Sequence, residues 1–280
     1  AMFLLQALQQ TMKDVAFVVL NVKGFDLLRL DENNPNLTDF QKNEYQRCGI
    51  DCKPFDNVKY FYPFQKNSDR LFSGTHLKKE VLETQHNSDR AHNFIYTYEE
   101  NADSLDLLFS SIDDPAQTME SILSYIGENP NFQGLTWDSF LDEISEFTKK
   151  GHGKDKDISV MSWRKFKRLI RKSVMNDIFQ PNKGGAEKRQ VFLRNEIQNI
   201  NQGEVFVIDI ARLEEQLQTF VFGDIVRAVY DLKLGETDRP ENEIPKRIVI
   251  FVDELNKYAS SSAPKTSPIL NNILEITEGG

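Results

Sequence analysis

The sequence predicts an α/β protein, in which a mainly parallel β-sheet with crossover helices is interrupted by a mostly α-helical inserted domain. Three apolar runs rich in β-branched residues carry this prediction: VAFVVL at 15–20, VFVIDI at 205–210 and RIVIFV at 247–252. Continuous runs of this kind are typical of strands that are buried on both faces of a parallel sheet. Helical patterns alternate with the runs, as crossover connections require.

The helices of the α/β part flank these runs. Phe3, Leu4, Ala7 and Leu8 recur at helical spacing, so a helix is expected at the start of the chain. A long amphipathic helix should follow the second run, with apolar residues at 213, 217, 220, 221 and 225. Another should follow the third run and a Ser/Pro loop, beginning near Pro268, because proline is favoured in the first turn of a helix.

The middle of the chain, residues 33–202, has a mainly helical pattern. Apolar spacing predicts helices near 105–112, 119–126, 137–147 and 163–178, with Thr136 capping the third. The segment YFYPF at 60–64 is a candidate strand, and Pro63 favours an edge position for it. We therefore expect a discontinuous core, 1–32 and 203–280, around an insertion domain, 33–202.

Composition bounds the class of protein. The chain has 280 residues, 39% hydrophobic and 28% charged, and no apolar run approaches the roughly 20 residues of a membrane span. A soluble, cytoplasmic protein without membrane contact is expected. The net charge of −9 excludes a uniformly basic surface, so any nucleic-acid contact must be local. Cys48 and Cys52 are interpreted as reduced thiols, which is favoured over a zinc site completed by His76 or His92.

An acidic pair, Asp253–Glu254, follows the third apolar run directly. In P-loop ATPases an acidic residue at the end of a buried strand holds magnesium, usually through water. A second carboxylate beside it can act as general base for the attacking water. We therefore assign Asp253 to the metal and Glu254 to catalysis. The alternative is that the pair only begins a solvated turn.

The residues around this pair carry a family resemblance. The sequence DELNKY, a Ser-rich loop and PILNNILEITEGG together resemble the Walker B region of HerA-type translocases, in the FtsK/HerA branch of RecA-like ATPases. The segment DVAFVVLNVKGFDLLRLDE resembles the second strand of that family and its Lys-Gly-x-Asp-Leu-Leu continuation, which begins here at Lys23. Residues 3–10 match the helix that follows the phosphate-binding loop in the family.

The resemblance implies a RecA-like core that binds ATP and Mg²⁺ and hydrolyses ATP to move or unwind DNA. It also implies a homo-oligomeric ring, expected to be a hexamer, and a nuclease as a partner. Lys23 could reach the nucleotide or a neighbouring subunit, although an ordinary lysine in a turn after a strand is an equally good interpretation. Helical insertions occur in the family where residues 33–202 lie.

The chain departs from the family in one respect, because the phosphate-binding motif G-x-x-x-x-G-K-[ST] occurs nowhere in it. Lys183–Gly184–Gly185 lacks the rest of the motif. We expect an internal fragment of such an ATPase, cut just after the loop and inactive by itself. One alternative is a non-catalytic scaffold that has lost the loop, and another is an unrelated P-loop enzyme with a similar strand.

A basic segment, WRKFKRLIRK at 163–172, is the local candidate for DNA binding. Its apolar residues share one face of the predicted helix, so the segment could equally be a solvated helix face or a partner-binding helix. The six basic residues are Arg164, Lys165, Lys167, Arg168, Arg171 and Lys172.

Three further charged residues are weaker candidates. Arg212 and Arg227 could act across a subunit interface, where arginines stabilise transition-state charge, but surface arginines are common. Asp209 ends the second apolar run and is expected to cap the helix that follows.

Overall fold

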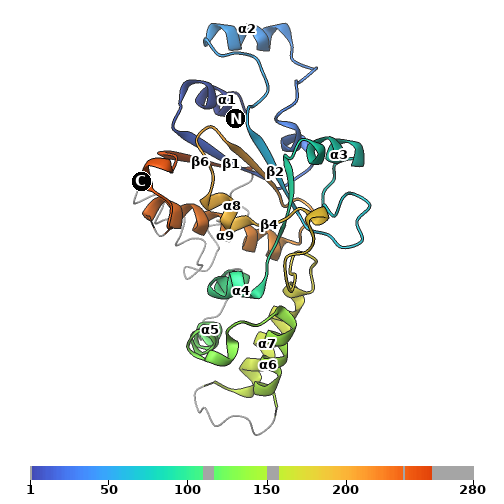
Figure 1. The fold of residues 1–280 in the computed structure, drawn as a ribbon, viewed down its shortest axis with the longest axis vertical. Coiled ribbons are helices and arrows are strands. Elements are labelled where there is room, and N and C mark those ends of the chain that lie inside the picture. The colour runs from blue at the N-terminus through green and yellow to red at the C-terminus, as the bar shows by residue number, and fades with distance from the viewer. Residues whose placement is uncertain (1, 110–116, 150–157, 236, 254–280) are drawn as a thin grey trace.

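The computed structural model describes residues 2–109, 117–149, 158–235 and 237–253 (Figure 1). Its strands are β1 (Val15–Asn21), β2 (Val58–Pro63), β3 (Ala91–Ile95), β4 (Gln190–Phe192), β5 (Val205–Asp209) and β6 (Arg247–Val252). Its α-helices are α1 (Met2–Thr11), α2 (Asp39–Arg47), α3 (Lys79–Asn87), α4 (Tyr98–Asn101), α5 (Thr118–Glu128), α6 (Trp137–Phe147), α7 (Val160–Val174), α8 (Leu193–Gln198) and α9 (Glu215–Leu234). The 3₁₀ helix η1 (Asp26–Arg29) follows β1, and the 3₁₀ helix η2 (Ala102–Phe109) follows α4.

The strands of this part of the chain form one all-parallel sheet in the order β4-β3-β2-β5-β1-β6. The predicted α/β class is therefore confirmed, and the sheet is consistent with a RecA-like core. The three predicted strands β5, β1 and β6 are neighbours. β1 and β5 are buried along their whole length, as their uninterrupted apolar sequences require.

Helices cover both faces of the sheet (Figure 1). Successive residues of a strand point to opposite faces, so β1 contributes to two apolar clusters. Val15 and Val19 pack with Leu5 of α1 and Leu82 of α3. The alternate residues of β1, Leu20 among them, pack with α8, α9 and the helices of residues 98–174.

The connections that leave β1 and β5 run to opposite faces of the sheet. The chain after β1 passes through η1, whose Leu28 lies in the α1-side cluster, and returns at β2 on the far side of β5. The chain after β5 passes through α9 on the other face and returns at β6 on the far side of β1. Such divergence between adjacent parallel strands leaves a crevice at their carboxyl ends, where ligands of open α/β sheets bind.

The sheet extends further into the middle of the chain than the sequence predicts. Strands β2, β3 and β4 come from residues 33–202, the range assigned to the insertion domain, so the helical part reduces to residues 98–174 between β3 and β4. The sequence indicates β2 through the candidate strand at 60–64, but it does not reveal β3 and β4, because β4 has three residues and β3 contains polar residues. Asn93 of β3 is fully buried, with its Oδ1 accepting a hydrogen bond from Ser73 at 2.7 Å.

The edge position expected for β2 is wrong, because β2 lies between β3 and β5. Pro63 is the last residue of the strand, so its missing N–H falls where the ladder ends. Its carbonyl oxygen still accepts a hydrogen bond from the backbone N–H of Gly74 at 2.7 Å. Proline is therefore compatible with an interior strand here.

Helices α5, α6 and α7 lie at the end of the molecule opposite α2 (Figure 1). Phe140 of α6 and Phe166 of α7 belong to the same apolar cluster as the sheet and α9, so the helical part shares the core of the sheet. Trp137 Nε1 donates a hydrogen bond to the carbonyl oxygen of Tyr96, just beyond β3, at 2.8 Å. The predicted cap of α6 is confirmed, since the Thr136 hydroxyl accepts from the N–H of Ser139.

No helix in the described ranges combines the length and apolarity needed to cross a bilayer.

A buried ion pair joins α8 to α9. Arg194 Nη2 lies 2.9 Å from Oδ1 of Asp224, which is fully buried. The Tyr96 hydroxyl donates to the other carboxylate oxygen at 3.2 Å, and Arg194 also donates to Ser104 at 2.6 Å. These partners compensate the cost of removing two charges from water.

We predict that Asp224→Ala destabilises the fold by about 3–5 kcal/mol, because it leaves the Arg194 guanidinium without its counter-ion. Urea unfolding measures this. Asp56→Ala is the matched control, since Asp56 forms an exposed pair with Lys53 at 2.7 Å, and the loss of such a solvent-screened pair should destabilise the fold far less. Equal losses in the two variants would contradict the assignment.

His86 of α3 is buried, and its Nε2 has no hydrogen-bond partner in the described structure. Burial is the main cause that lowers its pKa from 6.5 to about 4, and the charges of Arg189 and His92 act in the same direction. The folded protein therefore keeps this imidazole neutral under conditions in which the unfolded chain protonates it.

We predict that the free energy of unfolding falls as the pH drops from about 6.5 towards 4, because only the unfolded chain takes up a proton at His86 in this window. His86→Gln lacks this titration and should lose less stability over the same range. Urea unfolding of both proteins across the window tests this. Parallel stability profiles would show that His86 does not contribute.

Candidate functional site

Three polar side chains end three adjacent strands at the carboxyl edge of the sheet. Asn21 of β1 is the register partner of Asp209 of β5. Leu20 pairs with Val252 of β6, so Asp253 follows β6 at the level of Asn21. Register neighbours in a parallel sheet project to the same face, here the face of α1. The ends of these strands therefore bring two carboxylates and an amide together at the crevice that the topology predicts, with Asp209 fully buried.

A pocket of about 720 Å³ opens beside these strand ends. Lys23 and Asp253, which the sequence predicts as nucleotide-binding and metal-binding residues, both line it. The other described residues of its lining include the apolar side chains of Met2, Phe3, Leu27, Leu37, Phe40 and Phe251, and the polar side chains of Asn21, Asp26, Gln41, Glu44, Tyr45 and Cys48. Residues more than 200 positions apart thus meet in one hollow.

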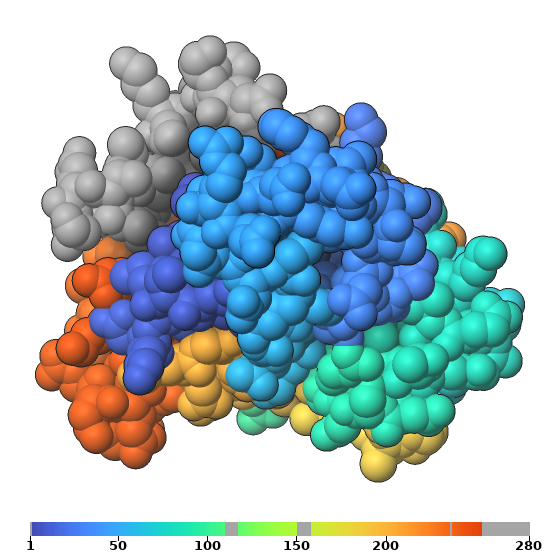
Figure 2. Space-filling model, turned by 90° about the horizontal axis from the view of Figure 1, so that it is seen from above, coloured from blue at the N-terminus to red at the C-terminus, as the bar shows by residue number. Residues whose placement is uncertain are grey.

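The turn after β1 places Lys23 at the pocket. Gly24 has φ +68, a conformation that glycine adopts without strain. Asn21 Nδ2 donates to the Gly24 carbonyl oxygen at 3.2 Å and closes the turn. Lys23 and Asp26 are exposed on either side of Gly24. The first segments of the chain, in blue, lie across this end of the molecule in Figure 2, between the teal residues around α3 and the orange residues late in the chain.

Asp209 lies beneath the pocket and is fully buried. Its carboxylate accepts hydrogen bonds from Thr75 Oγ1 at 2.6 Å, Asn21 Nδ2 at 2.8 Å and the N–H of Ala211 at 3.1 Å. Burial raises its pKa, and these donors act in the opposite direction. The expected role as a helix cap is wrong, because α9 begins at Glu215 and Glu214 is its N-terminal flanking residue.

Asn21 is 1% exposed, and its Oδ1 has no hydrogen-bond partner in the described structure. Its Nδ2 is engaged by Asp209 and Gly24, which fixes the orientation of the amide. A buried acceptor without a donor costs about 1–3 kcal/mol. Sequence analysis missed this residue, although a polar side chain ending an apolar strand, just before Lys23–Gly24, is a detectable signal.

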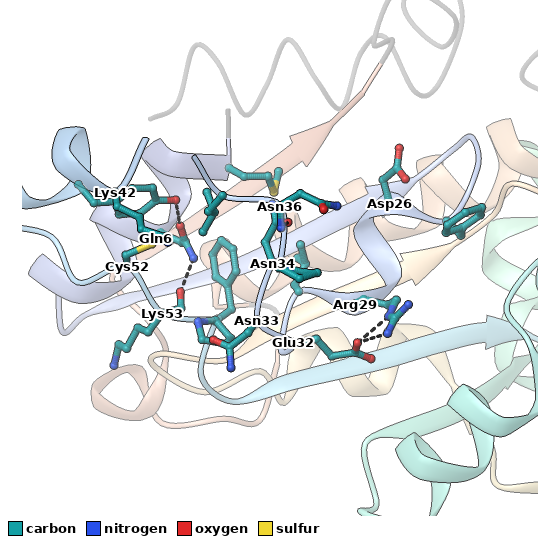
Figure 3. Close-up of a pocket in the computed structure, with 18 residues that line it drawn as sticks. Gln6, Asp26, Arg29, Glu32, Asn33, Asn34, Asn36, Lys42, Cys52 and Lys53 are labelled. Carbon is teal, nitrogen blue, oxygen red and sulfur yellow. Dashed lines mark hydrogen bonds and ion pairs between the residues drawn. The ribbon is translucent and has the colours of Figure 1, made fainter. Parts of the chain in front are cut away.

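A second hollow of about 700 Å³ adjoins the first and shares Met2, Asp26, Leu37 and Tyr45 with it (Figure 3). Amide side chains gather here, from Gln6 and from Asn33, Asn34 and Asn36. Gln6 donates to the Lys53 carbonyl oxygen at 2.6 Å, and Arg29 pairs with Glu32. The described lining of this hollow contains none of the residues that the sequence predicts for catalysis, metal binding, nucleotide binding or DNA binding.

The donor set of the first pocket suits a hard cation that keeps much of its water. The structure groups no three His, Cys, Asp or Glu side chains into a metal cluster within its described ranges. Magnesium typically takes one or two carboxylates and retains several waters. Asp253, together with the unpartnered amide oxygen of Asn21, meets that requirement. Glu254, the predicted general base, lies outside the described residues.

The predicted DNA-binding residues lie on α7, away from the pocket. Five of the six cations are exposed and Lys167 is half-buried, with Trp163, Phe166 and Ile170 facing the core. Lys167 donates to Ser145, Arg164 to the Thr148 carbonyl oxygen, and Lys172 lies 3.6 Å from Glu214. Lys165, Arg168 and Arg171 form no hydrogen bond or ion pair with described residues.

The remaining candidates are separated by their contacts. Arg227 forms a two-pronged pair with Asp106, at 3.0 and 2.6 Å, which engages its guanidinium within the chain. Arg212 is exposed and donates to the Thr75 carbonyl oxygen at 3.1 Å, near the buried Asp209. Cys48 and Cys52 are free, exposed thiols, in keeping with the interpretation as reduced cysteines.

Comparison with known proteins finds no family model and no curated protein that matches this chain.

Proposed function

We propose that this chain is part of an ATP-driven DNA motor of HerA type, with the pocket at the ends of β1 and β6 as its nucleotide and magnesium site. The observation that carries the proposal is that Lys23 and Asp253 line one pocket at the carboxyl edge of a parallel sheet. Ligands of open α/β folds bind at this edge. The resemblance of both segments to the HerA family supports ATP as the nucleotide.

Each residue then has a defined task. Asp253 holds the magnesium ion, which neutralises phosphate charge when it is bound. The Lys23 ammonium attracts the phosphates, and Glu254 accepts the proton of the attacking water. The apolar side chains of Met2, Phe3 and Phe251 line the same pocket and offer a surface against which the nucleotide can pack. In the intact protein a phosphate-binding loop supplies the remaining contacts, and a ring of subunits, proposed as a hexamer, encircles DNA beside a partner nuclease.

One observation favours a second function, that of a non-catalytic scaffold. The 280 residues contain no G-x-x-x-x-G-K-[ST] motif, so this chain alone offers no backbone cradle for the β- and γ-phosphates. An ATPase relative that retains the pocket but binds partners in place of nucleotide would also lack this motif. ATP binding and turnover, measured on the unaltered protein and on variants of Asp253 and Glu254, separate the two functions.

We predict that Asp253→Asn weakens magnesium-dependent nucleotide binding and turnover together, in a protein that carries this chain with a phosphate-binding loop. Glu254→Gln keeps the shape of the side chain but loses its basicity. It should spare Mg-ATP binding and reduce hydrolysis by about 10²–10⁴-fold. ATP turnover and nucleotide affinity, measured side by side on both variants, test these roles.

Asp56→Asn is the matched control for these variants, since Asp56 is an exposed carboxylate that is not among the described residues lining this pocket. It should leave turnover within about threefold of wild type, since uninvolved surface substitutions have small effects. Wild-type hydrolysis by Glu254→Gln would reject the assignment of the base. Wild-type binding and hydrolysis in both acidic-pair variants would reject the proposed site, and an unaltered protein that neither binds nor hydrolyses ATP would favour the scaffold.

We further propose that α7 contacts the DNA backbone and predict that neutralising Lys165, Arg168 and Arg171 to Gln flattens the salt dependence of DNA binding. The slope of log K against log salt should fall by about 0.9 for each phosphate that the variant no longer neutralises, hence by up to about 3. Fluorescence anisotropy of labelled duplex DNA at several salt concentrations measures it.

The control for this triple variant is Lys42, Lys53 and Lys79 to Gln, which changes the net charge equally but lies on α2, α3 and the loop before β2. It should leave the slope nearly unchanged. An equal effect of both triple variants would mean that DNA responds to total charge, and no effect of either would identify the basic residues of α7 as a solvated face.

A further inference from the structure

Asn21 has a buried amide whose two ends differ in their surroundings. Its Nδ2 donates to Asp209 at 2.8 Å and to the Gly24 carbonyl oxygen at 3.2 Å. Its Oδ1 has no partner among the described residues, although the residue is 1% exposed and lines the pocket that holds Asp253. The buried Asp209 carboxylate therefore fixes the orientation of the amide. The Oδ1 atom is the hydrogen-bonding group of Asn21 that remains available to the pocket.

A buried acceptor without a partner calls for an explanation, and a hydrogen-bond donor that enters the pocket would supply one. The charged side chains in the described lining of the pocket are Asp26, Glu44 and Asp253 on the negative side and Lys23 on the positive side. The local charge thus favours cations over anions as the group that enters unaided. Water bound to a divalent cation is a strong donor, because the ion polarises its O–H bonds.

We propose that Asn21 Oδ1 accepts a hydrogen bond from a water molecule of the divalent cation that is held at Asp253. The inference rests on the proposed function, which places the cation there, and adds the residue that orients its hydration shell. The strand register supports it, since Asn21 and Asp253 end neighbouring strands at the same level. Adjacent strands lie about 4.8 Å apart, a distance that a carboxylate-bound, hydrated ion spans.

Asp209 takes part through Asn21. Its carboxylate accepts the Nδ2 hydrogen and so keeps the amide from rotating, while Thr75 and Ala211 satisfy its remaining positions. Partners behind a metal ligand orient it in this manner, and their removal typically weakens metal binding by about 10–100-fold. Asn21 is accordingly a positioning residue, and Asp209 is the group that fixes its orientation.

The test is a titration of the 280-residue protein with Mn²⁺, which prefers oxygen ligands as Mg²⁺ does. The electron paramagnetic resonance signal of the free ion measures how much Mn²⁺ is bound. Asp253→Asn should abolish the site. Asn21→Leu keeps the size of the side chain but removes the acceptor, and it should weaken Mn²⁺ binding by about tenfold. Thr75→Val is the control, because it also takes a donor from Asp209 but leaves Asn21 Oδ1 in place.

The outcomes separate the inference from the proposed function. Unchanged Mn²⁺ affinity in Asp253→Asn would overturn the metal site and with it this inference. Loss of binding in Asp253→Asn but wild-type affinity in Asn21→Leu would overturn the role of Asn21 alone. Equal weakening by Asn21→Leu and Thr75→Val would also overturn it, because the effect would then arise from the damaged buried network.

A second measurement uses the unaltered protein and does not depend on a variant that folds. Mg²⁺ titration should shift the side-chain Cγ and Nδ2 resonances of Asn21, with the same half-saturation as the carboxyl resonance of Asp253. The shifts should vanish in Asp253→Asn. Asn21 resonances that stay fixed while the Asp253 carboxyl is saturated would overturn the inference.

Discussion

The carboxyl edge of the sheet depends on how the buried carboxylate of Asp209 is satisfied. A charge in that position is stable only with several donors, and they come from three places: β1 through Asn21, the segment after β2 through Thr75, and the turn before α9 through Ala211. Satisfying one carboxylate therefore fixes the relative positions of elements that are distant in the sequence. These hydrogen bonds are buried beneath the pocket, whereas the side chains of Lys23 and Asp26 in its lining are exposed.

The same arrangement explains how a site forms without a dense cluster of ligands. The divergence of the chain after β1 and β5 opens the crevice, and the register of β1 with β6 brings Asp253 beside it. Negative side chains outnumber positive ones in the described lining, while α7 carries the basic residues at the opposite end of the molecule. The proposed cation site and the proposed DNA-binding helix are thereby kept apart on a protein whose net charge is −9.

Much of the fold could be predicted from the sequence, and the elements that could not be predicted were missed for physical reasons. β1, β5 and β6 are uninterrupted apolar runs, so their place inside a sheet could be inferred, as could α7 and the Thr136 cap. β3 and β4 could not, because their polar residues are satisfied by distant partners, such as Ser73 for Asn93. Asp253 was predicted from its place at a strand end and Lys23 from the family resemblance, whereas the hydrogen bond of Asn21 to Asp209 depends on the register of two strands that are far apart in the sequence.

The shared core of the sheet and the helical part has a mechanical consequence. Tension applied to α7 would pass through the apolar cluster to which Phe166 and Phe140 belong, and through the Trp137 hydrogen bond to the backbone beyond β3, before it reached β2 and β5. Within the described ranges the helical part shares one apolar core with the sheet and does not pack as a separate domain. A force applied at α7 would thus be transmitted through the same packed core that positions the carboxyl ends of the strands.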